Sequence, residues 1–139
     1  MENAMDPAEY HLLTFEEAYS FLNDIHDGLP EAILRELNGG IVLLPDVVLS
    51  PHRRADDLYI LGMYHYEPYG LGRYITINYG SFAKIHRHST KTKQKAALQD
   101  VLYHELVHHL ESLAGVRDLE EKDKEDIARY LQTHQDGEA

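Results

Sequence analysis

The stretch Leu102–Leu110, L-Y-H-E-L-V-H-H-L, contains an H-E-x-x-H motif that runs from His104 to His108. Residues four apart on a helix lie on one face, about 6 Å from each other. Both imidazoles can therefore hold one zinc ion, with Glu105 beside it. We predict that this stretch forms a helix and that the fold and the functional site are organised around it.

The motif helix is expected to run from about residue 92 to 114, with two faces of different character. Its leucines cluster on one side, whereas His104 and His108 lie almost opposite them; the leucines are Leu98, Leu102, Leu106, Leu110 and Leu113. Such a pattern predicts that one face packs on the core and that the other lines a cleft.

The remaining chain predicts a mixture of helices and strands. Thr14 and Glu17 form a capping box at the start of a helix that ends near His26, and Pro30 starts a short second helix that ends near Leu37. Apolar runs predict strands, and Gly62 within one of them predicts a bulge or a close backbone approach. The expected strands are 41–44, 58–66 and 74–78, and a last helix is expected at 118–131.

These elements predict an α+β fold in which a small mixed sheet of three or four strands packs on the motif helix, with flanking helices. With 139 residues, the chain suits one domain. We expect a flexible leader at 1–12, a single domain at 13–133 and a frayed tail at 134–139.

Composition excludes several classes of function. No run of about 18 apolar residues is present, so no membrane span is expected. The net charge of −11 argues against nucleic-acid binding. The first ten residues lack the features of a secretory signal and the chain has no cysteine, which together favour the cytoplasm. Nothing in the sequence specifies an oligomeric state.

The motif predicts hydrolytic chemistry on a peptide or protein substrate. His104 and His108 are expected to hold Zn²⁺ as neutral imidazoles, with a third protein ligand and a water completing the site. Glu105 is the expected general base, because zinc lowers the pKa of such a water towards about 7. The alternative is a non-catalytic zinc-binding or protein-interaction module, although a purely structural zinc site would not need Glu105.

The third metal ligand stays open between three carboxylates. Glu111 shares the helix face of the two histidines and leans towards them. Asp118 and Glu120 follow Gly115, where the chain is expected to turn back towards the metal. Asp118 also suits the start of the next helix, because aspartate is a favoured N-cap.

Other polar residues near the motif have simpler interpretations. His109 points about 100° away from His108 and is expected to be a hydrogen-bonded packing residue. Asp100 is expected to be a surface acid, with orientation of a ligand imidazole as the alternative. The candidates for stabilising the oxyanion are His65 and the tyrosines of the strand region, at positions 64, 66, 69, 74 and 79. The strand around Gly62 is a candidate edge for an extended peptide.

Several blocks in order resemble the minimal zincin-like metalloprotease domains, a family of small bacterial H-E-x-x-H zinc peptidases. They are Leu29-Pro30, Ile41–Leu44, Leu61–Tyr64, Tyr74–Ile77 and His104–His109. The resemblance implies a compact zincin-like fold, a zinc cofactor, peptidase activity, and Asp118 as the third ligand because it follows Gly115 by three residues. Here Gly115 lies four residues further from His108 than in the family pattern, about one helical turn or ~6 Å. Glu111 and Glu120 therefore remain alternatives.

Overall fold

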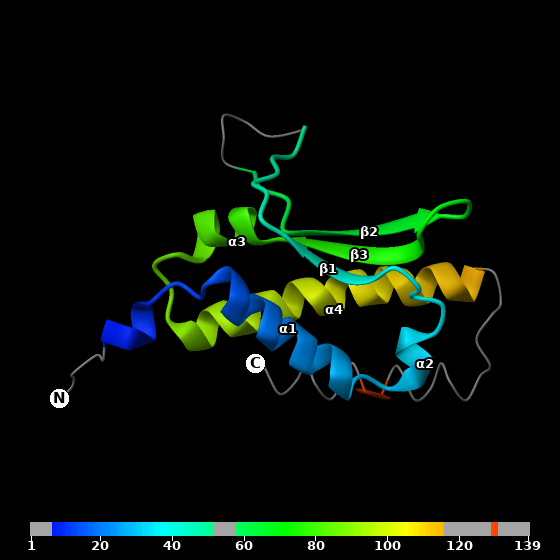
Figure 1. Cartoon of the computed structure of the whole chain (residues 1–139), viewed down its shortest axis with the longest axis horizontal. Coiled ribbons are helices and arrows are strands. Elements are labelled where there is room, and N and C mark those ends of the chain that lie inside the picture. Colours follow the sequence, from blue (N-terminus) through cyan, green and yellow to red (C-terminus); the bar gives the residue numbers. More distant parts are fainter. Residues whose placement is uncertain (1–6, 52–57, 116–128, 131–139) are drawn as a thin grey trace.

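The computed structural model describes residues 7–51, 58–115 and 129–130. Within them, Figure 1 shows a sheet along one side of a long central helix and a second helix along another side. The predicted α+β class is confirmed. The elements are η1 (Pro7–Tyr10, a 3-10 helix), α1 (Phe15–Gly28), α2 (Glu31–Leu34), β1 (Gly40–Leu44), β2 (Gly62–Glu67), β3 (Gly72–Asn78), α3 (Tyr79–His86) and α4 (Lys91–Gly115).

Helix α1 begins as its sequence predicts. The Thr14 hydroxyl accepts a hydrogen bond from the Glu17 amide (3.1 Å), and the Glu17 carboxylate accepts one from the Thr14 amide (2.8 Å). This capping box satisfies two amides that the first helical turn leaves without partners. Helix α2 is shorter than expected, because Arg35 leaves the helical conformation and Glu36 adopts a positive φ of 61°.

The sheet has the strand order β1-β3-β2, with β1 parallel and β2 antiparallel to the central β3. The strand predicted at 58–66 begins only at Gly62. Before that point the chain pairs with another partner, since the Ile60 amide donates to Val48 (2.8 Å) and the Ser50 amide donates to Leu58 (2.8 Å). Strand β2 therefore lies at one edge of the sheet, directly beside α4.

The core forms where the leucine face of α4 meets the sheet and α1. Burying each such side chain stabilises the fold by about 1.5–3 kcal/mol. The predicted leucine face is confirmed, because four of its five members are inaccessible to solvent and Leu110 is partly buried. The fully buried members are Leu98, Leu102, Leu106 and Leu113, and they share this core with Ile75, Ile77, Ala18 and Leu22.

The first turn of α4 is fixed to the N-terminal segment by Gln94, which is fully buried. Its amide oxygen accepts a hydrogen bond from the Leu13 amide (2.8 Å), and its amide nitrogen donates to the carbonyls of His11 (3.1 Å) and Ser89 (2.9 Å). A buried side-chain amide with three bonds is well satisfied. Within the range 1–12, which was predicted to be a flexible leader, the structure thus has η1 and an anchored segment.

Two predictions fall largely beyond the described residues. The last helix expected at 118–131 is described only at Arg129 and Tyr130, which are helical, and the Tyr130 ring lies 6.5 Å from that of Tyr103. The tail expected at 134–139 is not described at all. Among the helices that are described, none combines the length and apolar character needed to cross a bilayer.

Candidate metal centre

The two motif histidines present facing nitrogens on the solvent side of α4. Their Nε2 atoms lie 3.3 Å apart, with ring centroids separated by 4.8 Å and ring planes nearly perpendicular at 87°. Two nitrogens bound at about 2.0–2.1 Å to one tetrahedral zinc ion are themselves about 3.3 Å apart. The spacing of His104 and His108 therefore fits a shared zinc ion.

Glu111 contacts the second nitrogen of one of these rings. Its Oε1 lies 3.3 Å from His108 Nδ1, on the opposite side of the imidazole from Nε2. Both side chains are substantially exposed, at 49% for His108 and 68% for Glu111. A carboxylate at this nitrogen fixes the tautomer and orientation of a metal-binding imidazole. In this geometry Glu111 holds His108 in place.

Glu105 is a buried carboxylate that lines the same groove as the exposed His108 imidazole. It is only 7% exposed, and no hydrogen bond or ion pair joins it to any residue that the structure describes. The predicted close approach at Gly62 is confirmed here, because a Cβ at that position would lie 3.3 Å from Glu105 Cγ and 2.7 Å from Val101 Cγ1. A buried carboxylate without a partner is costly, and such groups concentrate at functional sites.

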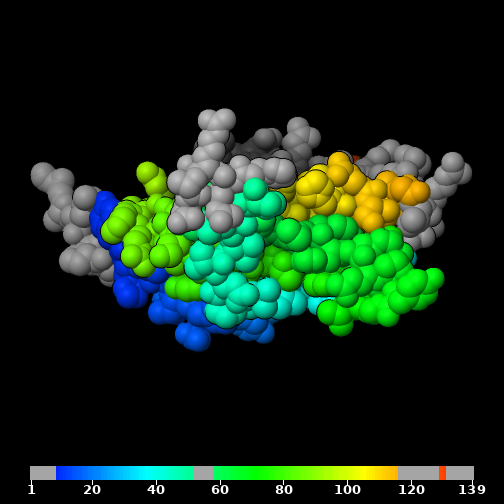
Figure 2. Space-filling model, turned by 90° about the horizontal axis from the view of Figure 1, so that it is seen from above, coloured from blue at the N-terminus to red at the C-terminus, as the bar shows by residue number. Residues whose placement is uncertain are grey.

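An open groove of about 630 Å³ lies between β2 and the second half of α4. It brings Glu105 and His108 together with side chains from both elements. Figure 2 shows the end of α4, in yellow to orange, exposed along the edge of the strands, in green. The lining residues are Gly62, Met63, Tyr64, Glu105, His108, Glu111 and Ser112.

The groove wall is held by a chain of hydrogen bonds with a defined direction. His109 Nε2 lies 2.9 Å from the Arg35 carbonyl, which only accepts, so this nitrogen carries the proton. His109 Nδ1 is then the acceptor for the Tyr64 hydroxyl, 2.9 Å away. Arg73 donates to the Ser112 hydroxyl at 3.1 Å, next to the same tyrosine. His109 is thus the hydrogen-bonded packing residue that the sequence predicts.

Burial shifts the pKa of both His109 and Tyr64. Burial lowers the pKa of His109, while its hydrogen bond to the Arg35 carbonyl opposes that shift. Burial raises the pKa of the Tyr64 phenol, against the opposing hydrogen bonds from Ser112 and Arg73. Both groups are therefore held neutral in the folded protein near pH 7.

The residues considered for stabilising an oxyanion do not all lie at the groove. Of the positions considered, only Tyr64 lines the groove, and its proton is committed to His109. His65 faces the other side of the sheet, where it stacks on Tyr74 (4.4 Å between centroids) and bonds Thr76 Oγ1 at 2.9 Å. The alternation of side chains along β2 explains this separation, because neighbouring residues project from opposite faces.

The structure thus places only some of the predicted site residues. His104 faces His108, and His108 shares the groove with Glu105, whereas Asp118 and Glu120 lie outside the described residues. Within 7–51, 58–115 and 129–130, no three His, Asp or Glu side chains already gather around a metal position. Ser112 and Met63 also line the groove, and sequence reasoning missed both. Ser112 carried one signal, since it lies four residues after His108 on the motif helix.

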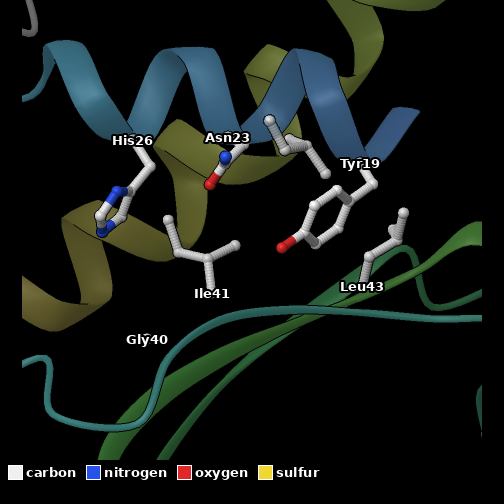
Figure 3. Close-up of a pocket in the computed structure, with 7 residues that line it drawn as sticks. Tyr19, Asn23, His26, Gly40, Ile41 and Leu43 are labelled. Carbon is white, nitrogen blue, oxygen red and sulfur yellow. The ribbon is translucent and has the colours of Figure 1, made fainter. Parts of the chain in front are cut away.

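A second pocket, of about 230 Å³, lies on the other side of the domain between α1 and β1. Figure 3 shows Tyr19, Asn23 and His26 of α1 pointing towards Ile41 and Leu43 of β1. It shares no lining residue with the groove beside the motif histidines. Its single titratable imidazole, His26, is bonded to Asp27 at 3.3 Å.

The fold and motif define an α+β domain that presents an H-E-x-x-H helix at the edge of a three-stranded sheet. No family model matches the sequence, and no curated protein matches it. A solved structure described as a "Conserved hypothetical protein" from Thermo thermophilus is 30% identical, with a TM-score of 0.62. The match covers 73% of this chain and 98% of that chain. The chain belongs to the same family as that protein.

Proposed function

We propose that this protein is a zinc-dependent metallopeptidase. The observation that carries the proposal is Glu105, a carboxylate 7% exposed and without a partner among the described residues. It shares a groove with His108, whose Nε2 lies 3.3 Å from that of His104. A carboxylate of this kind suits proton transfer, because no described residue occupies the oxygens that would accept the proton. A purely structural metal site would have no use for it.

Each residue of the site has a proposed role. His104 and His108 hold zinc through Nε2, and Glu111 orients the His108 ring through Nδ1. Asp118 is the proposed third ligand, with Glu120 as the alternative, while the position of Glu111 favours its orienting role. Zinc, when bound, supplies the Lewis acidity that polarises a carbonyl and makes a water acidic. Glu105 takes a proton from the attacking water and delivers it to the leaving amine.

The surroundings of the site suit an extended peptide. Among the described residues β2 pairs only with β3, so its other edge is free beside the groove. A peptide backbone can bond to such an edge as an added strand. The groove of about 630 Å³ is open to solvent, as the entry of a peptide chain requires. The cysteine-free composition favours a cytoplasmic peptide or protein as substrate.

The decisive test compares Glu105→Gln with His104→Ala. We expect Glu105→Gln to retain zinc, measured by elemental analysis of protein purified without chelator, and to lose at least about 100-fold in peptide hydrolysis. His104→Ala should lose both zinc and activity. Full hydrolysis by Glu105→Gln contradicts the assigned general base. Zinc binding without hydrolysis in the unmodified protein favours the non-catalytic module instead.

A further inference from the structure

The outer face of the sheet, opposite α4, carries a second hollow of about 460 Å³. Its wall is largely apolar, and part of that apolar surface meets solvent: Met63 is 42% exposed, Val42 is 37% exposed and Leu71 is 60% exposed. The loops before β2 contribute Val48 and Ile60. Exposed apolar side chains that gather around one hollow form a candidate binding surface.

Strand register places this hollow directly beside the outer edge of β2, which pairs with no strand in the described part of the chain. Val42 pairs with Thr76 and Thr76 pairs with Met63, so these three residues form one row across the sheet. All three line the hollow. A strand added at the edge of β2 would place its own residue next to Met63, as the fourth member of that row.

The same edge also leads into the groove that holds Glu105. Gly62 and Tyr64, on either side of Met63, face this groove, and Met63 itself borders both cavities. Side chains of an added strand alternate between the two faces of the sheet. When one residue of the strand lies beside Met63, its two neighbours therefore lie over the groove next to Glu105 and His108.

We infer that the hollow is a specificity pocket for an apolar side chain of the peptide substrate, at a fixed position within two residues of the cleaved bond. The inference rests on the proposed peptidase function and names the substrate class: extended peptides with Leu, Ile, Met, Phe or Val at that position. Met63 borders both cavities, which favours a substrate chain over a second copy of this protein, because a second copy would not need the groove.

The test maps cleavage by three zinc-loaded proteins: wild type, Met63→Lys and Val47→Lys. Val47 is 47% exposed and does not line the hollow, so it controls for an added surface lysine. The probe is a mixture of short unstructured peptides in which every residue type occurs at every position, and mass spectrometry identifies the cleaved bonds. Circular dichroism checks that each variant is folded, and Val42→Lys, in the same row, replaces Met63→Lys if that variant is not.

We expect wild type and Val47→Lys to prefer apolar residues about tenfold at one position near the cleaved bond. Met63→Lys should lose that preference and favour Asp or Glu at the same position. Cleavage with an unchanged preference in the folded hollow variant, Met63→Lys or its replacement Val42→Lys, overturns the pocket and leaves the peptidase proposal intact. Absence of cleavage by wild type overturns both. A wild-type dimer that Met63→Lys dissociates, with unchanged preference, makes this face an interface between copies and also overturns the pocket.

Discussion

The hydroxyl of Tyr64 on β2 donates its proton to Nδ1 of His109 on α4, across 2.9 Å. The direction follows from the other end of the imidazole, where the Arg35 carbonyl can only accept. One bond thus joins the edge strand to the motif helix immediately behind the groove. The Tyr64 hydroxyl therefore has no proton left to donate to a ligand in the groove.

Removal of this hydroxyl should destabilise the fold. Tyr64→Phe leaves a fully buried imidazole nitrogen without its donor, which costs about 1–3 kcal/mol in the free energy of unfolding. Urea denaturation measures the difference. Tyr66→Phe is the matched control, since Tyr66 is 50% exposed on the same strand and keeps the ring that Arg73 covers. Equal stability of the two variants would contradict the bond.

Stability should fall in mild acid because of His109. Its pKa is lowered in the folded protein, so below its ordinary value of about 6.5 the unfolded chain binds the proton more readily. The contribution of His109 to the free energy of unfolding is complete above that pH and declines as the pH falls below it. Urea denaturation at pH 7.5 and 5.5 should show a larger loss for wild type than for His109→Gln. Parallel losses would exclude His109 as the cause.

Glu111 should affect metal affinity without being essential to it. Glu111→Gln removes the carboxylate at His108 Nδ1, and the loss of such an orienting group weakens metal binding by about 10- to 100-fold. Competition with a chromophoric zinc chelator measures this change. Asp100→Asn, an exposed acid on the same helix, is the control and should bind as wild type does. A loss as complete as that of His104→Ala would instead make Glu111 the third ligand.

Gly62 is required by the contact between the edge strand and α4. A methyl group at this position would lie 2.7 Å from Val101 Cγ1, and overpacking of this kind typically costs about 1–3 kcal/mol. Gly62→Ala should therefore lower stability, and Val101→Ala added to it should restore part of the loss by removing the clashing methyl. Gly28→Ala, with nothing within 4 Å of the new atom, should show no such steric loss. Strict additivity of Gly62→Ala and Val101→Ala in thermal unfolding would refute the steric cause.

Local patterns in the sequence predicted much of this fold. The capping box of Thr14 and Glu17, the leucine face of α4 and the pairing of His104 with His108 all depend on residues within a few turns of each other. Their geometry follows from the helical repeat alone. The close approach at Gly62 was also predictable, because a glycine within a strand commonly marks one.

Features that depend on long-range pairing were not predictable in the same way. The late start of β2 follows from bonds between Ile60 and Val48, and nothing in the apolar run from residue 58 distinguishes that partner from β3. The face on which His65 lies follows from its register opposite Tyr74. Met63 and Ser112 meet at the groove only because β2 packs against α4, and neither residue type by itself predicts a site.

Strand β3 lies at the centre of the sheet but follows both of its partner strands in the sequence. During synthesis β1 and β2 emerge before the strand that pairs with both, and α4 emerges after all three. The histidine pair needs only a turn of helix, whereas the burial of Glu105 needs α4 docked beneath Gly62. A helix that forms alone can therefore bring the two imidazole nitrogens together, whereas Glu105 becomes buried only once α4 has docked on the sheet.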